Sequence, residues 1–274
     1  MELFKIDQRT CLQDGICAEV CPSKIIFFQK GGYPRPLAGL ESQCIKCGHC
    51  VAACPSGSFS HKNIDIEQCP PVQRELQLSP EHCEHFLRSR RSIRVYKEKS
   101  VEKSKINRLI EIGRYAPSGR NSQDTEWLVL ANRDEIKRIA GLVIDWMHWM
   151  LDNNEEEAIS MHLEKVIGRW NDGMDIVFRG APVVIVGHAA MDNHRAQTSC
   201  TLALSYLELA AASLGLGCCW AGYFSRAAAA FLPLVDALAL PGDHRSFAGM
   251  MLGYPRYKYH RLVMRNSPAI TWRF

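Results

Sequence analysis

The stretch CIKCGHCVAACP, residues 44–55, carries four cysteines in the spacing C-x2-C-x2-C-x3-C, and the last cysteine precedes a proline. An earlier stretch, CLQDGICAEVCP, residues 11–22, has the same length and the same closing Cys-Pro, but Asp14 stands at its second cysteine position. Cysteines at such short intervals suit metal binding better than disulfide pairing. The two arrays therefore predict a small metal-binding domain at the start of the chain.

The spacing of both arrays is typical of iron–sulfur clusters. In a two-cluster arrangement the cysteine before proline reaches across to the cluster held by the other array. Zinc is the alternative, but a zinc site needs only four ligands and leaves the two Cys-Pro ends unexplained. The predicted ligand sets are Cys44, Cys47, Cys50 and Cys21 for a 4Fe-4S cluster, and Cys11, Cys17 and Cys54 for a second cluster.

Residues 5–65 resemble the two-cluster bacterial ferredoxins, and Asp14 is the departure from that family. The resemblance implies that an aspartate here either ligates iron through oxygen or leaves a 3Fe-4S cluster in place of a 4Fe-4S one. A carboxylate is a harder and weaker ligand for this iron than a thiolate, so the iron beside it should be labile. Alternatively, Asp14-Gly15 is only a turn and Cys69 or Cys83 replaces the ligand. We favour Asp14 as a cluster ligand because it occupies the ligand position in register.

The overall composition suits two unequal globular domains. The chain has 274 residues, of which 47% are hydrophobic and 23% charged. A net charge of +4 is too mild to imply a nucleic-acid partner. The start of the sequence lacks the apolar segment of a signal peptide, so the cytoplasm is the expected compartment. Residues 199–222 contain one charge, Glu208, and we interpret them as a helix buried in the protein or at an interface, with no membrane span.

The chain is expected to divide into an iron–sulfur domain over residues 1–66, a linker over 67–84 and a second domain over 85–274. Three prolines and the lack of a clear period mark the linker. Hydrophobic periodicity gives the elements of the second domain. The predicted elements are a helix over 101–116 that Ser104 can cap or enter, strands over 127–131 and 182–187, a mainly helical stretch over 145–180 and an extended tail over 265–274.

Two polar segments of the second domain are candidates for cofactor binding. SRRSIRVY, residues 89–96, can hold a phosphate through arginine forks and a hydroxyl, or it is a solvated run of charge. APSGRNSQ, residues 116–123, offers backbone and amide groups that can bind a planar heterocycle, or it is ordinary turn chemistry. Neither segment is diagnostic by itself.

Together with LELAAASLGLGCCWAG (207–222) and LGYPRYKYHRLVMR (252–265), these segments resemble the nitroreductase family of flavoproteins over residues 85–274. The resemblance implies an α+β fold with a mixed sheet sandwiched by helices, and a homodimer that binds FMN at the subunit interface. Residues 199–214 would form the long interface helix. The residues that it implies as FMN contacts are Arg90, Arg91, Ser92, Arg94, Pro117, Ser118, Gly119, Asn121, Gln123, Cys219, Trp220, Ala221, Gly222, Arg261 and Arg265.

The resemblance also suggests a role for each group. Arg90, Ser92 and Arg94 would bind the phosphate and ribityl chain, and Arg265 or Arg261 would add charge. Ser118 and its neighbours would approach the flavin from the partner subunit, and residues 219–222 would lie near the ring. Many family members read Asn-x-Gln-Pro-Trp, whereas Asp-Thr-Glu separates Gln123 from Trp127 here. Two alternatives are open for Trp146, Trp149 and Met150: they line an aromatic pocket, or they belong to the hydrophobic core. No catalytic side chain is assigned.

Clusters joined to a flavin domain predict an FMN-dependent oxidoreductase. Electrons would enter from a ferredoxin-like donor or from NAD(P)H and leave to a small electrophile such as a nitroaromatic, an enone or a quinone. Two alternatives stay open. One is an electron-transfer or redox-sensing protein that turns over no small molecule, and the other is a module that remodels flavin itself.

Overall fold

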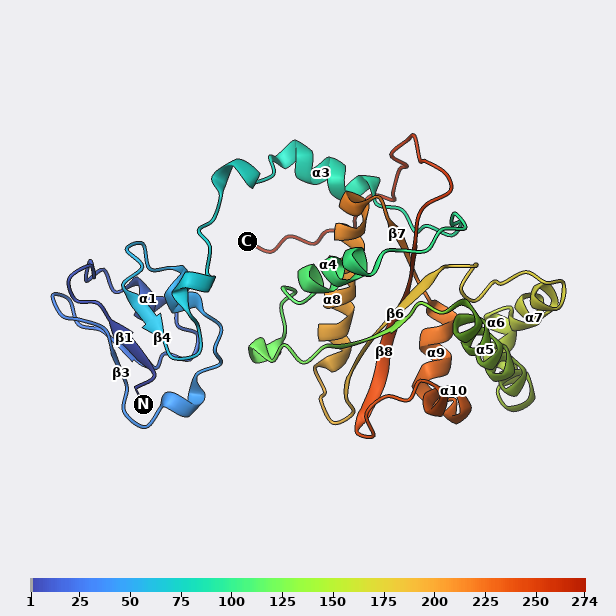
Figure 1. Ribbon diagram of the computed structural model, residues 1–274, viewed down its shortest axis with the longest axis horizontal. Coiled ribbons are helices and arrows are strands. Elements are labelled where there is room, and N and C mark those ends of the chain that lie inside the picture. Colours follow the sequence, from blue (N-terminus) through green and yellow to red (C-terminus); the bar gives the residue numbers. More distant parts are fainter. Residues whose placement is uncertain (1) are drawn as a thin grey trace. The chain divides into compact units, whose positions relative to one another are not determined.

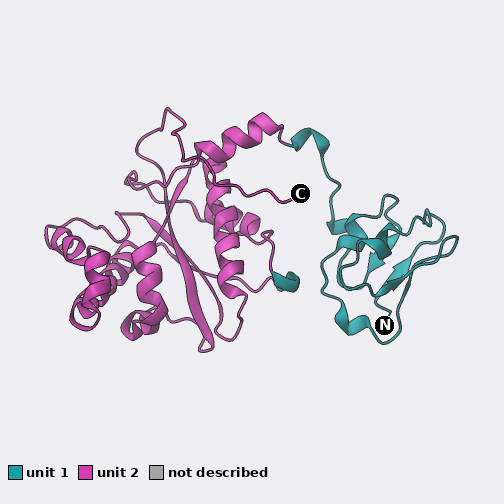
Figure 2. Ribbon diagram, turned by 180° about the vertical axis from the view of Figure 1, so that it is seen from behind, with its two compact units in different colours: residues 1–77, 119–122 teal, residues 78–118, 123–274 magenta. Residues whose placement is uncertain are grey.

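The computed structural model describes residues 2–274, which divide into two compact units (Figure 2). The first unit runs to Gln77 and includes Gly119–Ser122, and the second holds Leu78–Ser118 and Gln123–Phe274. Helix α3, Pro80–Ser89, begins inside the stretch expected to be a linker. Ser79 starts this helix by accepting a hydrogen bond from the His82 backbone N–H at 3.2 Å, and Pro80 suits the first helical turn.

The first unit consists of short elements. Its elements are β1 (Phe4–Ile6), α1 (Ile16–Glu19), β2 (Ile26–Phe27), β3 (Arg35–Pro36), η1 (Glu41–Gln43), α2 (His49–Ala52), β4 (Phe59–His61), η2 (Ile66–Gln68), η3 (Arg74–Leu76) and η4 (Gly119–Asn121). β1 pairs antiparallel with β4, and β2 with β3. The rings of Phe4 and Phe59 stack with centroids 4.5 Å apart. This stack lies in a small core that also includes the cluster cysteines Cys17 and Cys21.

The second unit contains a four-stranded sheet with helices on both faces (Figure 1). Its further elements are α4 (Lys103–Gly113), β5 (Glu126–Leu130), α5 (Arg133–Asn153), α6 (Glu155–Ser160), α7 (Leu163–Asn171), β6 (Val183–Ala190), α8 (Ala196–Ala211), η5 (Ala212–Leu214), β7 (Gly217–Trp220), α9 (Gly222–Ala230), α10 (Leu232–Ala237) and β8 (His244–Gly253). The strand order is β5-β6-β8-β7, and every neighbouring pair is antiparallel. The α+β fold is therefore confirmed, but the expectation of a mixed sheet is wrong for the described residues. The connection from β6 through α8 crosses over β8 to β7, so the two strands that run in the same direction are separated by an antiparallel one.

The two faces of the sheet carry separate cores. Val183 and Ile185 of β6 pack with residues of α4 and α8, whereas Val184 and Val186 pack with residues of α5 and α9. Successive side chains of a strand point to opposite faces, so a strand covered on both faces needs a continuous apolar run. This is why β6 could be predicted from the sequence.

Helix α8 covers most of the stretch expected as a buried or interface helix. Its single charge, Glu208, is buried. None of the helices within the described residues has the length and apolar character needed to cross a membrane.

The structure also places several smaller features. Glu102 is the cap residue of α4, which begins at Lys103, so Ser104 enters the first turn of this helix. Trp146 and Met150 belong to the core, whereas Trp149 is exposed. Cys69 is exposed.

Candidate functional site

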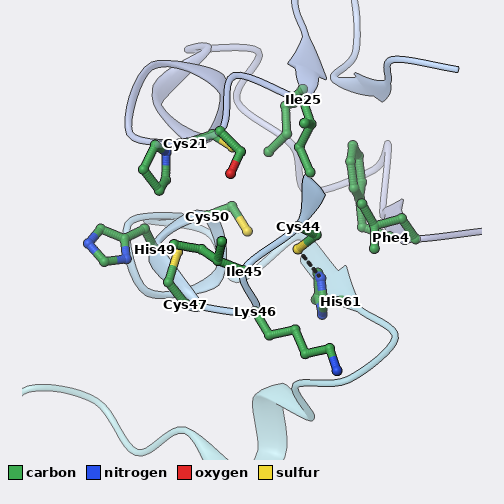
Figure 3. Close-up of a pocket in the computed structure, with 15 residues that line it drawn as sticks. Phe4, Cys21, Ile25, Cys44, Ile45, Lys46, Cys47, His49, Cys50 and His61 are labelled. Carbon is green, nitrogen blue, oxygen red and sulfur yellow. Dashed lines mark hydrogen bonds between the residues drawn. The ribbon is translucent and has the colours of Figure 1, made fainter. Parts of the chain in front are cut away.

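Four cysteines of the first unit line one cavity (Figure 3). The four are Cys21, Cys44, Cys47 and Cys50, the set expected for the complete cluster. Three of them come from the second array, and Cys21 comes from the end of the first array. The cavity wall also includes the apolar residues Phe4, Ile25 and Ile26. A thiol-lined, apolar cavity has the donor chemistry that a 4Fe-4S cluster requires.

The other predicted ligand set also comes together, around Cys17. Burial is the largest of the effects that raise the pKa of the Cys17 thiol to about 11, and the neighbouring Cys54, Asp14 and Cys11 act in the same direction. Cys17 belongs to the small core of the first unit, and the half-buried Cys54 packs against that core. Cys54 of the second array therefore lies in the same core as Cys17 of the first, as the crossed arrangement requires.

Burial also controls the protonation of the cysteines. It raises the pKa of Cys50 to about 11, with Cys47 and Cys21 acting in the same direction. Both Cys17 and Cys50 are therefore thiols at neutral pH in the absence of iron. Cluster assembly has to release these protons, since the thiolate is the ligand.

His61 donates a hydrogen bond to one cluster cysteine, a contact that the cysteine spacing did not reveal. Its Nε2 lies 3.4 Å from the Sγ of Cys44 (Figure 3). The backbone N–H of Asn63 donates to Nδ1 of the same ring at 3.1 Å. Burial, followed by Lys62 and Lys46, lowers the pKa of His61, which favours the neutral ring. A neutral ring that accepts at Nδ1 carries its proton on Nε2, so this N–H points at the Cys44 sulfur.

Two serines play the corresponding part for Cys54. The Oγ atoms of Ser58 and Ser56 lie 3.3 and 3.7 Å from its Sγ. Burial opposes ionisation of Cys54, but the hydrogen bonds from Ser58 and Ser56 outweigh it and lower the pKa of this thiol. Each of the two predicted ligand sets therefore contains one cysteine whose sulfur accepts a hydrogen bond from a side chain. The pattern PSGSFSH (55–61), directly after the second array, was the sequence signal for both donors.

Asp14 is exposed, and its Oδ1 accepts a hydrogen bond from the Ile16 backbone N–H at 3.1 Å. This contact starts α1, as the turn interpretation expects. It accounts for one carboxylate oxygen, and ligation of iron through the other stays a prediction. The proposed replacement ligands gain no support, because the Cys69 thiol donates to the Asp65 carbonyl and Cys83 belongs to the second unit.

In the second unit the arginine segment docks along β7. The backbone N–H of Ile93 donates to the Cys218 carbonyl at 2.8 Å. Gly217 permits this approach, since a Cβ there would lie 2.3 Å from the Ile93 side chain. Ile93 is buried, so its neighbours Arg94 and Ser92 are fixed on either side of it.

Three neighbouring cavities of the second unit collect seven of the fifteen predicted FMN residues. The first is lined by Arg94, Cys219, Trp220 and Gly222, together with Arg179, Tyr223 and Arg226. The second is lined by Arg90 and Arg91 with Cys218, Glu208 and Tyr259, and the third by Arg88, Arg90, Arg91 and Arg265. No acidic residue is among the described residues that line the third cavity. Arg88 and Arg90 are ion-paired with Glu84 and Glu208, but Arg91 and Arg265 have no such partner among the described residues and can bind a phosphate group. The glycine and aromatic residues of the first cavity suit a planar ring.

Glu208 is the functional neighbour that sequence reasoning did not use. Its Oε1 forms an ion pair with the Arg90 Nη1 at 2.8 Å, and its Oε2 accepts from the Trp220 Nε1 at 3.2 Å. The carboxylate is buried, whereas the Arg90 side chain is about one third exposed at 32%. Glu208 therefore holds Arg90 and Trp220 in fixed positions at the mouth of the candidate site. The one charge in an otherwise apolar helix was the signal that could have found it.

Some predicted contacts lie elsewhere. Pro117, Ser118 and Gln123 line none of the three cavities described above, and Ser118 Oγ instead accepts from the Gln123 backbone N–H at 3.0 Å. Ala221 is buried, with its N–H bonded to the Gly249 carbonyl. Gly119 and Asn121 are grouped with the first unit, and Arg261 is exposed. The hydroxyl of Ser92 lies against the Cys219 thiol. Their contact with FMN stays a prediction.

Comparison with known families decides the identity of the larger unit. The sequence model described as the nitroreductase family matches residues 87–254. The chain belongs to the nitroreductase family. A second model, described as a 4Fe-4S dicluster domain, matches residues 9–59 and gives this nitroreductase-family chain its N-terminal domain.

Relatives of this nitroreductase-family chain share its fold at low sequence identity. "Putative NADH dehydrogenase/NAD(P)H nitroreductase" of Archaeoglobus fulgidus is 24% identical over 179 residues, which is 64% of this chain and 87% of the relative. The nitroreductase with bound FMN from Bacteroides fragilis has a TM-score of 0.57 at 20% identity and covers 69% of this chain and 97% of its own. The nitroreductase with bound FMN from Desulfitobacterium hafniense has a TM-score of 0.57 at 21% identity, over 71% and 99% of the two chains. These similarities cover the larger unit.

Proposed function

We propose that this chain is an FMN-dependent oxidoreductase that receives electrons through two iron–sulfur clusters and reduces a small electrophile such as a nitroaromatic. The observation that carries the proposal is the pairing of two sites in one chain. Crossed sets of cysteines form the first site, and arginine-lined cavities in a nitroreductase-family fold form the second. The solved relatives with bound FMN support the choice of flavin.

FMN is held in this proposal by residues on both sides of β7. Arg90, Arg91 and Arg265 bind the phosphate, since, among the described residues, no acidic one lines their cavity and Arg90 is the one of the three with an ion-pair partner. Arg94 and the Trp220–Gly222 turn border the space for the ring. Glu208 binds one N–H group of the Arg90 guanidinium. The remaining N–H donors are left for the phosphate.

Electron transfer requires the two kinds of cofactor because their chemistry differs. Bound FMN supplies the exchange between single electrons and a two-electron reduction of an organic acceptor. The cysteine sets position the clusters, and His61 and Ser58 direct hydrogen bonds to the ligand sulfurs Cys44 and Cys54. The proton for the acceptor comes from solvent in this proposal. A homodimer, with Ser118 approaching the partner's flavin, and a ferredoxin-like or NAD(P)H donor complete it.

The first test concerns FMN binding. Arg90→Gln should lower the affinity for FMN by about tenfold or more, because a charge-assisted hydrogen bond is worth roughly 1.5–3 kcal/mol. Arg108→Gln, on the exposed face of α4, is the matched control and should bind FMN like the wild type. Fluorescence titration of apoprotein with FMN measures both. Equal affinity in the two variants would contradict the proposed phosphate site.

The second test concerns turnover and separates the alternatives. Anaerobic protein reduced with dithionite is mixed with a nitroaromatic, a quinone or an enone, and flavin and cluster absorbance are followed by stopped flow. Reoxidation much faster than in buffer alone supports a reductase, and the fastest acceptor identifies the substrate class. If no acceptor reoxidises the flavin faster than buffer, an electron-transfer or sensing role replaces the proposal. If the flavin itself is consumed, the flavin-remodelling alternative gains support.

A further inference from the structure

Three metal-ligating side chains meet at one end of the sheet in the second unit, outside the cavities described above. Glu126 begins β5, His188 lies near the end of β6, and His244 begins β8. One ligand atom from each lies within 4.8 Å of the others. β6 and β8 lie side by side in the sheet (Figure 1). None of these residues was singled out from the sequence, because 56 positions separate the two histidines.

The register of the sheet brings these side chains to the same face. Glu126 is paired directly with His188, and His188 with Ser246, across neighbouring antiparallel strands. Residues opposite each other in such pairs share a face, and so do residues two apart on one strand, such as His244 and Ser246. A shift in register between Gly187 and His188 accompanies this arrangement. β-bulges of this kind re-aim a side chain and occur often beside functional sites.

The distances suit a metal ion bound between the rings. The Nδ1 atoms of His188 and His244 lie 2.9 Å apart, and a carboxylate oxygen of Glu126 lies within 4.8 Å of a ring nitrogen of each histidine. Two nitrogens bound tetrahedrally to zinc at its usual bond length are separated by about 3.3 Å. The rings therefore need only a small adjustment. The Glu126 side chain is 59% exposed and has the freedom to rotate into place.

The surroundings provide further support. Ser246, buried and paired with His188, has a hydroxyl with no hydrogen-bond partner among the described residues. A water molecule bound to the metal would be a partner for such a hydroxyl. Asp243 lies 3.9 Å from the Nε2 of His244 and can orient that ring when Nδ1 binds the metal.

We propose that His188, His244 and Glu126 bind one divalent transition-metal ion of the Zn²⁺ class. Nδ1 of each ring and one carboxylate oxygen are the protein ligands, and the remaining position is open to water. Two imidazoles and one carboxylate form a recurrent ligand set for such ions. The ion joins β5, β6 and β8 at this end of the sheet. The site is independent of the clusters and of FMN.

The test uses holoprotein with intact clusters, so that the cluster cysteines are occupied. Zn²⁺ is titrated by calorimetry, and iron and zinc are measured after removal of excess metal. The wild type should bind one equivalent of Zn²⁺ per chain without loss of iron. Glu126→Gln should weaken binding by about tenfold or more, and His244→Ala should abolish it. His148→Ala, at an exposed position of α5, is the matched control and should bind Zn²⁺ like the wild type.

A second measurement keeps the result independent of folding defects. Glu126 is exposed, so Glu126→Gln should retain the melting temperature of the wild type in the absence of metal. Zn²⁺ should raise the melting temperature of the wild type and of His148→Ala, because a ligand that binds only the folded state stabilises it. It should raise that of Glu126→Gln by less. Absence of binding, equal binding in all variants, or binding only with loss of iron would each overturn the proposal.

Discussion

The two cysteine arrays of the first unit have nearly the same backbone but different chemistry. Gly15 and Gly48 both have φ 75° before α1 and α2, and the corresponding residues Gln13 and Lys46 have φ 55° and 52°. The left-handed turn that wraps the ligands is therefore present in both arrays. A Cβ at Gly15 would lie 2.5 Å from the Phe28 ring, so this glycine is fixed by packing as well as by φ.

The difference lies at one ligand position. Cys47 lines the cavity of its cluster, whereas Asp14 is exposed and bonds the backbone of Ile16. The turn thus forms without a thiol at this position, because glycine and local hydrogen bonds determine it. The comparison teaches that ligand geometry and ligand identity can be separated in this fold. We therefore expect Asp14 to change the affinity for one iron without disturbing the array.

The largest expected effect comes from removing the Cys47 thiol, whose counterpart in the first array is Asp14. Cys47→Ala should lose the cluster of the second array, because one of four thiolate ligands is gone. Asp14→Ala should lose at most one iron from its cluster. Iron and sulfide analysis with EPR on anaerobic protein compares the two variants. Equal losses in both would show that Asp14 is as strong a ligand as Cys47.

The next effect tests the lability of the Asp14 position. Asp14→Cys should slow the loss of iron to a chelator by about tenfold or more, because thiolate binds this iron more tightly than carboxylate. The rate is followed by absorbance of the chelated iron. Asp7→Cys, at a position outside the array, controls for an added thiol. A wild-type first array as resistant to the chelator as the second would contradict the expectation.

A smaller effect concerns the hydrogen bond from His61 to Cys44. His61→Phe retains the ring but removes the N–H, which should lower the reduction potential of that cluster by roughly 40 mV, since a hydrogen bond worth about 1 kcal/mol stabilises the reduced form. EPR-monitored redox titration measures this shift. The cluster that includes Cys54 is the internal control and should keep its potential. A shift of both potentials would indicate a general structural change.

The smallest effect belongs to Ser58. Ser58→Ala should lower the potential of the cluster held by Cys54 by roughly 20 mV, about half the value for His61, because the neutral hydroxyl is shared and Ser56 remains nearby. The same titration measures it, with the Cys44 cluster as reference. Removing both serines should double the shift. If Ser58→Ala moves the potential more than His61→Phe does, the order of the two donors is wrong.

The sequence by itself determined the features that depend on short intervals along the chain. The cysteine spacing predicted two ligand sets, and the structure brings together the members of each. The apolar run over 182–187 predicted a strand, which the structure has as β6. The resemblance to the nitroreductase family, over four short segments, was confirmed by the match to residues 87–254. Periodicity and motif spacing are local properties, so they can be read before the chain is folded.

Only the tertiary structure decided which distant groups meet. Glu208 reaches Arg90 across 118 positions, and it does so because α8 packs on β7 and the segment after Arg90 runs along β7. The direction of the strands was also decided at this level, since connections through helices give no local sign of parallel or antiparallel pairing. His188 and His244 meet because of the register of β6 against β8. A pairing between distant strands is set by the packing of two faces at once, which no short stretch of sequence contains.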